Sequence, residues 1–159
     1  MTATPVIAFM RMAAEEARTG IAKGDGGPFG ALIVRRGSVV ARAHNEVLAT
    51  RDPTAHAEVL AIRRAAGILK RFHLDDCELY TTCEPCPMCL GAVAWARIPR
   101  LYFGCTRDDA ADIGFSDRMI YDWIREKPGV SPAERISLDR ETCLRLFRDW
   151  RESRNSRLY

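Results

Sequence analysis

The hydrophobic residues near the start of the chain recur every three or four positions: Ile7, Met10, Ala14, Ala17 and Ile21. This spacing predicts an amphipathic helix over residues 6–23, which the glycine-rich stretch 24–27 ends. Two short apolar runs rich in β-branched residues follow, at residues 29–34 and 39–43. Because Arg36-Gly37-Ser38 lies between them, we expect the two runs to form a β-hairpin.

Helical and strand patterns alternate after this hairpin. A helix is predicted to start in the stretch 51–54, with Asp52 or Thr54 as its N-cap, and to run to about Leu69. A strand, a helix and a second strand are predicted next, at residues 78–82, 85–96 and 100–104. Two strand–helix units in a row favour parallel strands beyond the hairpin. The pattern therefore predicts an α/β fold, a three-layer α/β/α sandwich with a mixed central sheet.

In the last part of the chain, the sequence pattern predicts a loop over residues 108–114, a helix over 117–126 and a break over 127–132. A final helix is expected from Arg140 to about Arg154, with an apolar stripe that another surface must cover: Cys143, Leu144, Phe147 and Trp150. We find no repeat, low-complexity run or linker, so we expect one domain over residues 1–159. Within it, residues 140–159 form a C-terminal helix and a polar tail.

Composition and charge are those of an ordinary globular protein. Apolar residues make up 47% of the positions and charged residues 28%. No basic region precedes the first apolar residues, and no apolar stretch approaches about 18 residues, so we expect no signal peptide, no membrane span and a cytoplasmic location. The net charge of +3 comes from residues 140–159, which hold six arginines and three acids. This excess of positive charge is consistent with three roles for the segment: contact with nucleic acid, a solvated helix face or a subunit contact.

Six cysteines in a chain without an export signal indicate reduced thiols or a metal site rather than a disulfide framework. Cys83, Cys86 and Cys89 lie within seven residues of one another, and this clustering points to a metal site. The remaining three are expected to be small core residues: Cys77, Cys105 and Cys143.

Two fragments carry the candidate chemistry: His56-Ala57-Glu58 and Pro85-Cys86-Pro87-Met88-Cys89. An H-x-E motif followed by P-C-x-x-C is the signature of zinc deaminases. Zinc prefers nitrogen and sulfur ligands, and a catalytic zinc keeps one position open for water, so the expected ligands of Zn²⁺ are His56, Cys86 and Cys89. Both fragments fall at predicted helix starts, where the helix dipole favours the thiolates that a metal requires.

Glu58 is the expected catalytic residue. We expect it to take a proton from the attacking water and to pass it to a ring nitrogen of the substrate and then to the departing amine. This role requires His56 to lie at the edge of its helix, because residues two apart on a regular helix point to nearly opposite sides. One alternative is a closed structural zinc with Cys83 as a ligand, which would leave Glu58 without a task. His44 and His73 have no partner motif and are expected to be structural or on the surface.

Residues 52–58 and 83–92 resemble the cytidine deaminase-like superfamily, and within it the chain looks most like the bacterial guanine deaminases. The likeness covers nearly the whole chain and includes shorter segments: residues 27–31, 74–77, 95–97, 109–111, 114–117 and Tyr159. The resemblance implies a zinc-dependent hydrolase that converts guanine to xanthine and ammonia. It also implies a homodimer whose subunits exchange their C-terminal segments, so that each pocket is shared between the two subunits.

The resemblance implies substrate-binding residues as well. Asn45 resembles the residue whose amide hydrogen-bonds the base, and Phe29 resembles the ring that packs near it. Asp117 resembles an acid near the substrate amine, and Trp95 resembles a pocket wall. The terminal Tyr159 is expected to gate the pocket with its ring and hydroxyl. Without the resemblance, each of these residues has an alternative structural role. Asn45 could equally belong to a turn, and Asp117 could equally be a helix N-cap. Phe29 and Trp95 could be core residues.

A tRNA adenosine deaminase, which converts adenosine to inosine, is the main alternative. That family shares the fold, both zinc motifs and the asparagine, and residues 101–104 also match its pattern. The arginine-rich C-terminal end could bind tRNA phosphates. Residues 83–87 and the Gly114-Phe115 loop depart from its pattern. Deamination of cytosine, of a nucleoside or of an aminotriazine is a further alternative. A zinc-stabilised RNA-binding module is a different class, and Glu58 argues against it, because such a module has no use for a buried carboxylate beside an open zinc.

Overall fold

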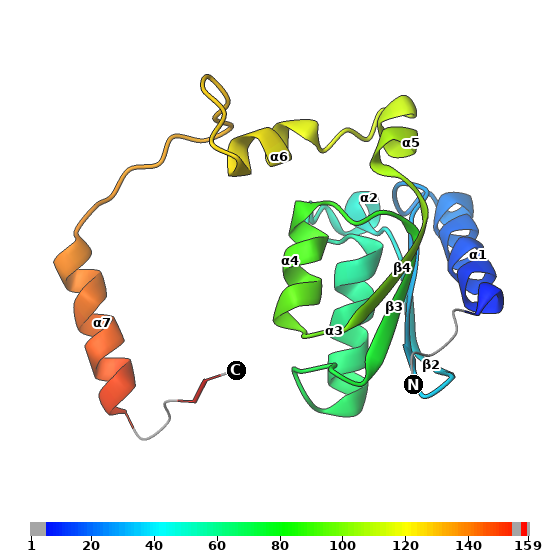
Figure 1. The fold of residues 1–159 in the computed structure, drawn as a ribbon, viewed down its shortest axis with the longest axis horizontal. Coiled ribbons are helices and arrows are strands. Elements are labelled where there is room, and N and C mark those ends of the chain that lie inside the picture. The colour runs from blue at the N-terminus through cyan, green and yellow to red at the C-terminus, as the bar shows by residue number, and fades with distance from the viewer. Residues whose placement is uncertain (1–5, 154–156, 159) are drawn as a thin grey trace. The chain divides into compact units, whose positions relative to one another are not determined.

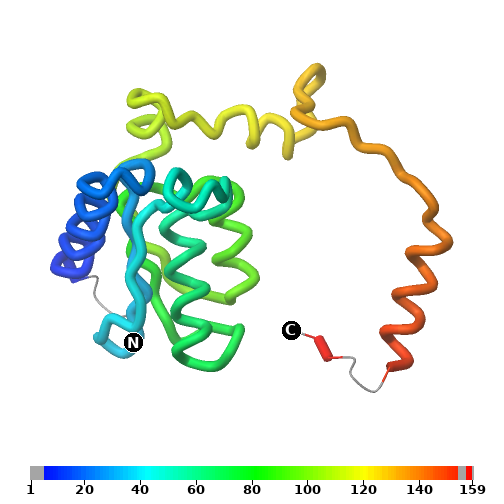
Figure 2. The backbone as a smooth tube through the Cα atoms, turned by 180° about the vertical axis from the view of Figure 1, so that it is seen from behind, coloured from blue at the N-terminus to red at the C-terminus, as the bar shows by residue number. Residues whose placement is uncertain are grey.

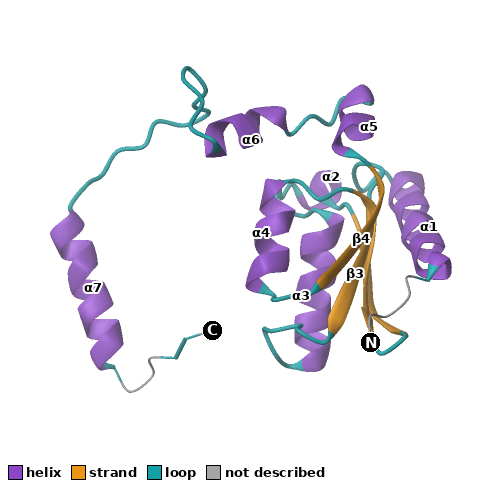
Figure 3. Cartoon of the chain, viewed as in Figure 1, coloured by secondary structure: helices purple, strands orange, loops and turns teal. Residues whose placement is uncertain are grey.

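A four-stranded sheet forms the centre of the unit Met1–Tyr121 in the structure, a computed structural model that describes residues 6–153 and 157–158. Its strands, drawn in orange in Figure 3, are β1 (Gly30–Arg35), β2 (Ser38–His44), β3 (Cys77–Cys83) and β4 (Arg100–Cys105). They are hydrogen-bonded in the order β2-β1-β3-β4. β1 pairs antiparallel with both β2 and β3, whereas β3 and β4 are parallel. The sheet is therefore mixed, and its parallel pair lies beyond the hairpin, as the sequence predicts.

Helices cover both faces of this sheet (Figure 1). Figure 2 shows α1 (Ile7–Lys23) on one side of the strands, and α3 (Ala57–Leu69) and α4 (Pro87–Trp95) on the other. Successive residues of a strand point to opposite faces, so β1 serves two clusters of buried side chains. Leu32 belongs to the cluster that includes Ala13 of α1, and Ile33 belongs to the cluster that includes Ala61 of α3. The predicted three-layer α/β/α sandwich is confirmed.

Gly30, at the start of β1, lets α1 pack closely against the sheet. A Cβ atom at this position would lie 2.1 Å from the carbonyl oxygen of Ala13 and 2.7 Å from the backbone nitrogen of Ala17. Both atoms belong to the backbone of α1, so a side chain here would push the helix away. The close contact brings residues 24–29, which connect α1 to β1, to the same end of the sheet as the start of α3 (Figure 1).

The helix expected to start in the stretch 51–54 begins later than predicted. α3 starts at Ala57, and its N-cap is His56, so the prediction of Asp52 or Thr54 as the cap was wrong. The Asp52 carboxylate instead accepts hydrogen bonds from the backbone N–H of Thr54, at 2.8 Å, and from its hydroxyl, at 2.7 Å. The side chain that suggested a cap therefore stabilises a turn ahead of the helix. A four-residue helix, α2 (Val47–Thr50), precedes this turn and was not predicted.

The predicted loop over residues 108–114 was also partly wrong, because α5 (Arg107–Asp112) occupies most of it. Thr106 caps this helix in a capping box: its hydroxyl accepts from the backbone N–H of Asp109, and the Asp109 carboxylate accepts from the backbone N–H of Thr106. α6 (Arg118–Ile124) follows and lies within the helix expected there.

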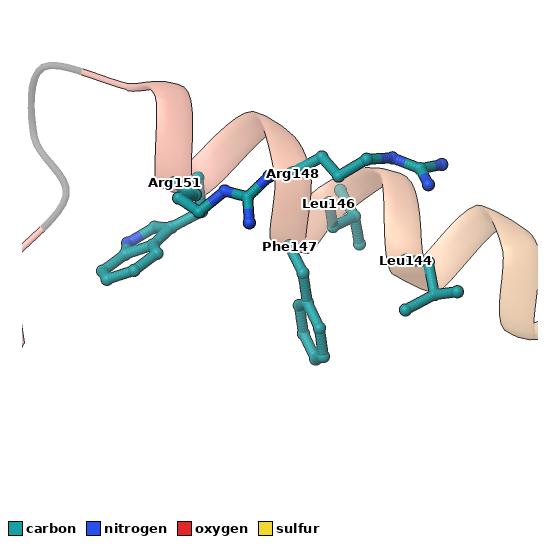
Figure 4. Close-up of a pocket in the computed structure, with 6 residues that line it drawn as sticks. Leu144, Leu146, Phe147, Arg148 and Arg151 are labelled. Carbon is teal, nitrogen blue, oxygen red and sulfur yellow. The ribbon is translucent and has the colours of Figure 1, made fainter.

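The chain divides into two compact units, Met1–Tyr121 and Asp122–Tyr159, and a single domain over residues 1–159 stays a prediction. The second unit contains α7 (Arg140–Glu152), which starts where the sequence predicts; the Asp139 carboxylate caps it by accepting the backbone N–H of Thr142 at 3.3 Å. None of its residues is buried. Figure 4 shows Leu144 and Phe147 on the same side of α7, so these two residues of the predicted apolar stripe share a face.

The cysteines outside the metal motif do not behave alike. Cys77 is buried in the core, as predicted, but Cys105 and Cys143 are exposed, so the prediction of core residues was wrong for these two. Cys105 ends the edge strand β4, and Cys143 lies on α7, where nothing in its own unit buries it. None of the helices in the described residues is long and apolar enough to cross a membrane.

Candidate active site

The two motif fragments meet at the starts of α3 and α4. His56 is the N-cap of α3, Cys86 is the N-cap of α4, and Cys89 lies in the first turn of α4. The Nδ1 atom of His56 lies 3.7 Å from the Sγ atom of Cys86 and 3.6 Å from that of Cys89. All three ligand atoms lie within 4.8 Å of one another, the separation expected when one ion joins them. One imidazole nitrogen and two sulfurs are also the donor set that zinc prefers, so these residues fit a zinc ion.

The backbone at His56 explains how this histidine and Glu58 share one site. His56 has an extended conformation, with φ of −72° and ψ of 151°, so it lies just outside the helix rather than in its first turn. His56 therefore has the helix-edge position that it needs to share a site with Glu58. Glu58, in the first turn of α3, lines the same cavity as His56 and Cys86.

The thiols at this site differ in how readily they ionise. A hydrogen bond from the Cys89 thiol, with help from His56, lowers the pKa of Cys86 to about 4. Cys86 is therefore a thiolate near neutral pH, the form that binds metals. Burial, by contrast, raises the pKa of Cys83 to about 11. The Cys83 thiol donates to the carbonyl oxygen of Thr106 at 3.5 Å and does not join the group of three ligands, although it lines the cavity.

Glu58 is the most deeply buried acid of the site, with 6% of its surface exposed. Burial raises the pKa of its carboxyl group above the usual range, because the charged form loses its hydration. A carboxyl group with a raised pKa accepts a proton more readily than a solvent-exposed carboxylate does. This is the property that a proton shuttle needs.

A cavity of about 440 Å³ lies in front of these residues, within the range that small-molecule sites occupy. Four of the residues expected from sequence to bind substrate or move protons line it: Phe29, Asn45, Glu58 and Asp117. The ring of Phe29 meets that of Phe115 edge to face, with centroids 5.1 Å apart. The two rings form an aromatic wall, and Phe115 was missed as a site residue, although the Gly114-Phe115 segment is part of the resemblance.

Asn45, the residue directly after β2, lines the cavity. It is 5% exposed, and its Oδ1 atom accepts hydrogen bonds from the backbone N–H groups of Gly27 and Val47, both at 3.2 Å. Because these bonds use the carbonyl end of the side chain, the NH₂ end is the part that can donate to an acceptor on a ligand. The Asn45 side chain therefore holds the backbone at Gly27 and Val47 with its oxygen and leaves its NH₂ group for a ligand in the cavity.

Asp117, just before α6, also lines the cavity. Its Oδ1 atom accepts a hydrogen bond from Nε of Arg107 at 3.2 Å, and the Arg107 guanidinium lies 3.7 Å from the centre of the Tyr121 ring. The backbone N–H of Arg107 donates to Glu84 at 3.3 Å. Arg107 and Glu84 also line the cavity, and sequence reasoning missed both: Arg107 lies outside the motifs, and Glu84 lies within residues 83–92 but was assigned no role.

One of the predicted residues that the structure describes does not line this cavity, and another lies outside the described residues. Trp95, at the end of α4, is 72% exposed and is not among the lining residues. Tyr159 lies outside the described residues. The pocket-wall role of Trp95 and the gating role of Tyr159 stay predictions.

Comparison with known proteins decides the family. Residues 4–105 match the family model of the cytidine and deoxycytidylate deaminase zinc-binding region. The chain belongs to this family of deaminases. It is 45% identical to the guanine deaminase of Bacillus subtilis (strain 168) over 154 residues, which cover 95% of this chain and 97% of that protein.

A solved structure and a second relative show how far along this chain the likeness to each of two kinds of deaminase extends. The X-ray structure of the guanine deaminase from Bacillus subtilis superposes with a TM-score of 0.88 at 43% identity, covering 98% of this chain and 99% of that one. The tRNA-specific adenosine deaminase of Aquifex aeolicus is also 45% identical, but over 60% of this chain and 62% of that protein. The predictions of a cytidine deaminase-like fold and of a zinc-dependent deaminase most like the bacterial guanine deaminases are confirmed.

Proposed function

We propose that this deaminase hydrolyses guanine to xanthine and ammonia. The observation that carries the proposal is the extent of the likeness: the guanine deaminase of Bacillus subtilis matches 95% of the chain, whereas the tRNA-specific adenosine deaminase of Aquifex aeolicus matches 60%. The cavity supports it, because an aromatic wall and a buried amide suit a flat base with polar edges.

We further propose that His56, Cys86 and Cys89 hold one zinc ion. The donor set, the 4.8 Å limit on their separations and the lowered pKa of Cys86 all favour this assignment. Bound there, zinc lowers the pKa of water and so supplies a nucleophile near neutral pH. The cavity adjoins His56 and Cys86, which leaves room for substrate beside the metal position, as a catalytic site requires.

The chain's own groups then hold the base and move protons. Glu58 accepts a proton from the attacking water and delivers it to a ring nitrogen, and afterwards it protonates the departing amine. The C–O bond to C2 of guanine forms first. The bond from C2 to the amine breaks afterwards, when Glu58 moves the second proton of that water from the new hydroxyl group to the amine, so one water is consumed and one ammonia leaves. Asn45 donates to an acceptor on the base edge, the rings of Phe29 and Phe115 pack near its face, and Asp117 accepts from the amine.

The C-terminal segment completes the pocket in this proposal. The described part of α7 carries exposed apolar side chains on one side, and a polar tail of seven residues follows it. We propose that residues 140–159 dock on a second copy of the chain in a homodimer and that Tyr159 closes over the substrate. Trp95, whose exposed ring lies on α4, would then form a pocket wall with the partner's help. A cytoplasmic location remains a prediction from sequence.

A substrate panel tests the proposed reaction. Purified protein is given guanine, adenine, cytosine or a tRNA anticodon stem, and both ammonia release and the ultraviolet change are followed. We expect guanine to react and the other three to stay unchanged. Turnover of the tRNA stem alone would overturn the proposal in favour of a tRNA adenosine deaminase, and turnover of cytosine alone would reassign the base.

A further inference from the structure

His44, the last residue of β2, has a carboxylate at each end of its ring. Its Nδ1 atom lies 3.0 Å from Oε1 of Glu16 on α1, and its Nε2 atom lies 2.8 Å from Oδ2 of Asp25. The histidine is 5% exposed, and both acids are mostly covered. Carboxylates only accept hydrogen bonds, so a ring protonated at both nitrogens donates to both of them. None of the three residues lines the cavity, so the proposed chemistry does not account for this cluster.

The ring sits tightly against α1, which makes it a fixed anchor. A Cβ atom at Gly20 would lie 2.6 Å from Cδ2 of His44, so the glycine allows the helix and the ring to touch. Glu16 lies one helical turn before Gly20 and holds the other side of the ring. The histidine therefore has little freedom to move, and it transmits this restraint to Asp25.

Asp25 joins this anchor to the loop that shapes the cavity. It follows Gly24, which ends α1 in a left-handed conformation, and its backbone N–H donates to the carbonyl oxygen of Gly20 at 3.0 Å. Its own carbonyl oxygen accepts from the backbone N–H groups of Leu48 and Ala49, both at 3.0 Å. The residues that follow it include three that line the cavity: Gly26, Gly27 and Phe29.

The same loop is held from the cavity side by Asn45, the neighbour of His44. The Asn45 side chain accepts from the backbone N–H of Gly27, and its backbone N–H donates to the carbonyl oxygen of Phe29 at 3.0 Å. A Cβ atom at Gly26 would lie 2.1 Å from Oδ1 of Asn45, so the loop fits against this amide with no space to spare. A small shift of the loop would therefore move the Asn45 amide and the Phe29 ring together.

We propose that His44 and Asp25 are positioning residues that set the affinity of the pocket for its base. Through their hydrogen bond, the sheet and α1 hold residues 25–29 in the conformation in which Asn45 and Phe29 meet the substrate. The identity of that substrate rests on the proposed function, but the link between the two residues and the loop does not. Neither residue touches the reacting atoms, so the effect falls on binding rather than on the chemical step.

Asp25→Ala tests this proposal, because it removes the loop end of the link and leaves His44 with Glu16. We expect the KM for guanine to rise about tenfold, since a hydrogen bond to a charged group is lost, while kcat stays within about threefold and the zinc content does not change. Asp25→Asn keeps an acceptor oxygen for the His44 ring, so it should restore KM to within about threefold of wild type. Hydrogen exchange at the backbone amides of Gly26, Gly27 and Phe29 should speed up in Asp25→Ala, and exchange within α3 and α4 should not.

Asp76→Ala is the matched control, because Asp76 is also a partly buried acid that pairs with basic side chains, Arg35 and Arg71, but has no link to the cavity. It should lower the melting temperature and leave KM unchanged. If Asp25→Ala behaves in the same way, with KM and loop exchange at wild-type values, Asp25 has a structural role only and the proposal is overturned. Wild-type protein that is inactive on guanine while the loop amides still respond to Asp25→Ala would refute the proposed substrate and support the positioning role.

Discussion

Leu79 in β3 and Phe147 in α7 are both large apolar residues, yet Leu79 is fully buried and Phe147 is 71% exposed. The first belongs to the unit Met1–Tyr121, where two clusters of buried side chains flank the sheet; the second belongs to the unit Asp122–Tyr159, whose described residues form no such cluster. Both lie in elements that hydrophobic periodicity predicts. Periodicity therefore predicts that a face is apolar but does not say which surface covers it.

The two amphipathic helices α1 and α7 show the same difference more closely. α1 buries small residues against the sheet, namely Ala13, Ala17 and Gly20, and this lets it lie close to the strands. α7 presents larger side chains, including Phe147 and Trp150, to solvent. A stripe of this kind on a short helix is typical of a surface that another chain or segment covers. The first unit holds the candidate chemistry, and the second is where association is expected.

The largest expected effect falls on the chemistry of the first unit. Glu58→Gln removes the proposed proton shuttle but keeps the size of the side chain, so guanine turnover should fall by about 10²–10⁴-fold or more, because one carboxylate serves several proton transfers. The zinc content and the melting temperature should stay near wild type. Steady-state kinetics beside elemental analysis makes the measurement, and a variant that turns over guanine within about tenfold of wild type would show that the shuttle is assigned wrongly.

The contrast in burial makes a prediction about stability. Leu79→Ala leaves a cavity in the core and should lower the free energy of unfolding by about 2–5 kcal/mol. Phe147→Ala should change the free energy of unfolding of the dissociated chain by about 0.5 kcal/mol or less, because the unit that contains Phe147 does not bury its ring. Urea unfolding at low protein concentration compares the two, and sedimentation should show that Phe147→Ala weakens the dimer. Equal losses in the dissociated chains would mean that Phe147 has a buried position within its own chain.

The tail after α7 should matter for turnover and hardly at all for folding. Deleting residues 155–159 is expected to reduce guanine turnover by roughly tenfold or more, because an open site admits water and weakens its electrostatics, while zinc content and thermal unfolding stay the same. Full activity in the truncated chain would rule out a closing role for Tyr159.

A mixing experiment then separates the two arrangements that such a loss allows. A Glu58→Gln chain with an intact tail is combined with a truncated chain that keeps Glu58. If the subunits exchange their C-terminal segments, one site of the mixed dimer has both parts, and some activity returns. Self-contained subunits would leave the mixture as inactive as its components.

The smallest expected effect is the pH dependence of an ion-pair network in the first unit. Hydrogen bonds from Arg71 and Arg35 lower the pKa of Asp76, so the folded state holds this carboxylate ionised more strongly than the unfolded chain does. The stabilisation is therefore complete above the unfolded pKa of about 3.9 and is lost as the pH falls further, through the folded-state value. Asp76→Asn should lower stability by about 1 kcal/mol or less at pH 7, because the group is partly exposed, and by less below pH 3. A difference that grows as the pH falls would contradict this sign.

The parts of the site that sequence predicts are those whose partners lie nearby in the chain or share one motif. His56 with Glu58, and Cys86 with Cys89, lie in short fragments at helix starts, and the structure brings the ligand atoms of His56, Cys86 and Cys89 together. The link between His44 and its two carboxylates could not be predicted, because Glu16 and Asp25 come from other elements, far from β2 in the chain.

Local polar residues misled the prediction where two roles compete for the same side chain. Asp52 has the chemistry of an N-cap but bonds to Thr54 in a turn, so α3 begins later than expected. The spacing of Thr106 and Asp109 is that of a capping box, and it is the signal that would have revealed α5. Hydrogen-bonding chemistry identifies such residues, and only the path of the backbone decides between a turn and a cap.

The central claim is that guanine deamination requires a zinc ion at the starts of α3 and α4, and a zinc titration tests it most directly. Metal-free protein is given increasing zinc, and guanine turnover is measured at each addition, with Cys86→Ala as the control. We predict that activity rises in proportion to bound zinc, reaches its plateau at about one ion per chain and stays absent in Cys86→Ala. Full guanine turnover by metal-free protein, or a Cys86→Ala chain that binds zinc and reacts like wild type, would contradict the account.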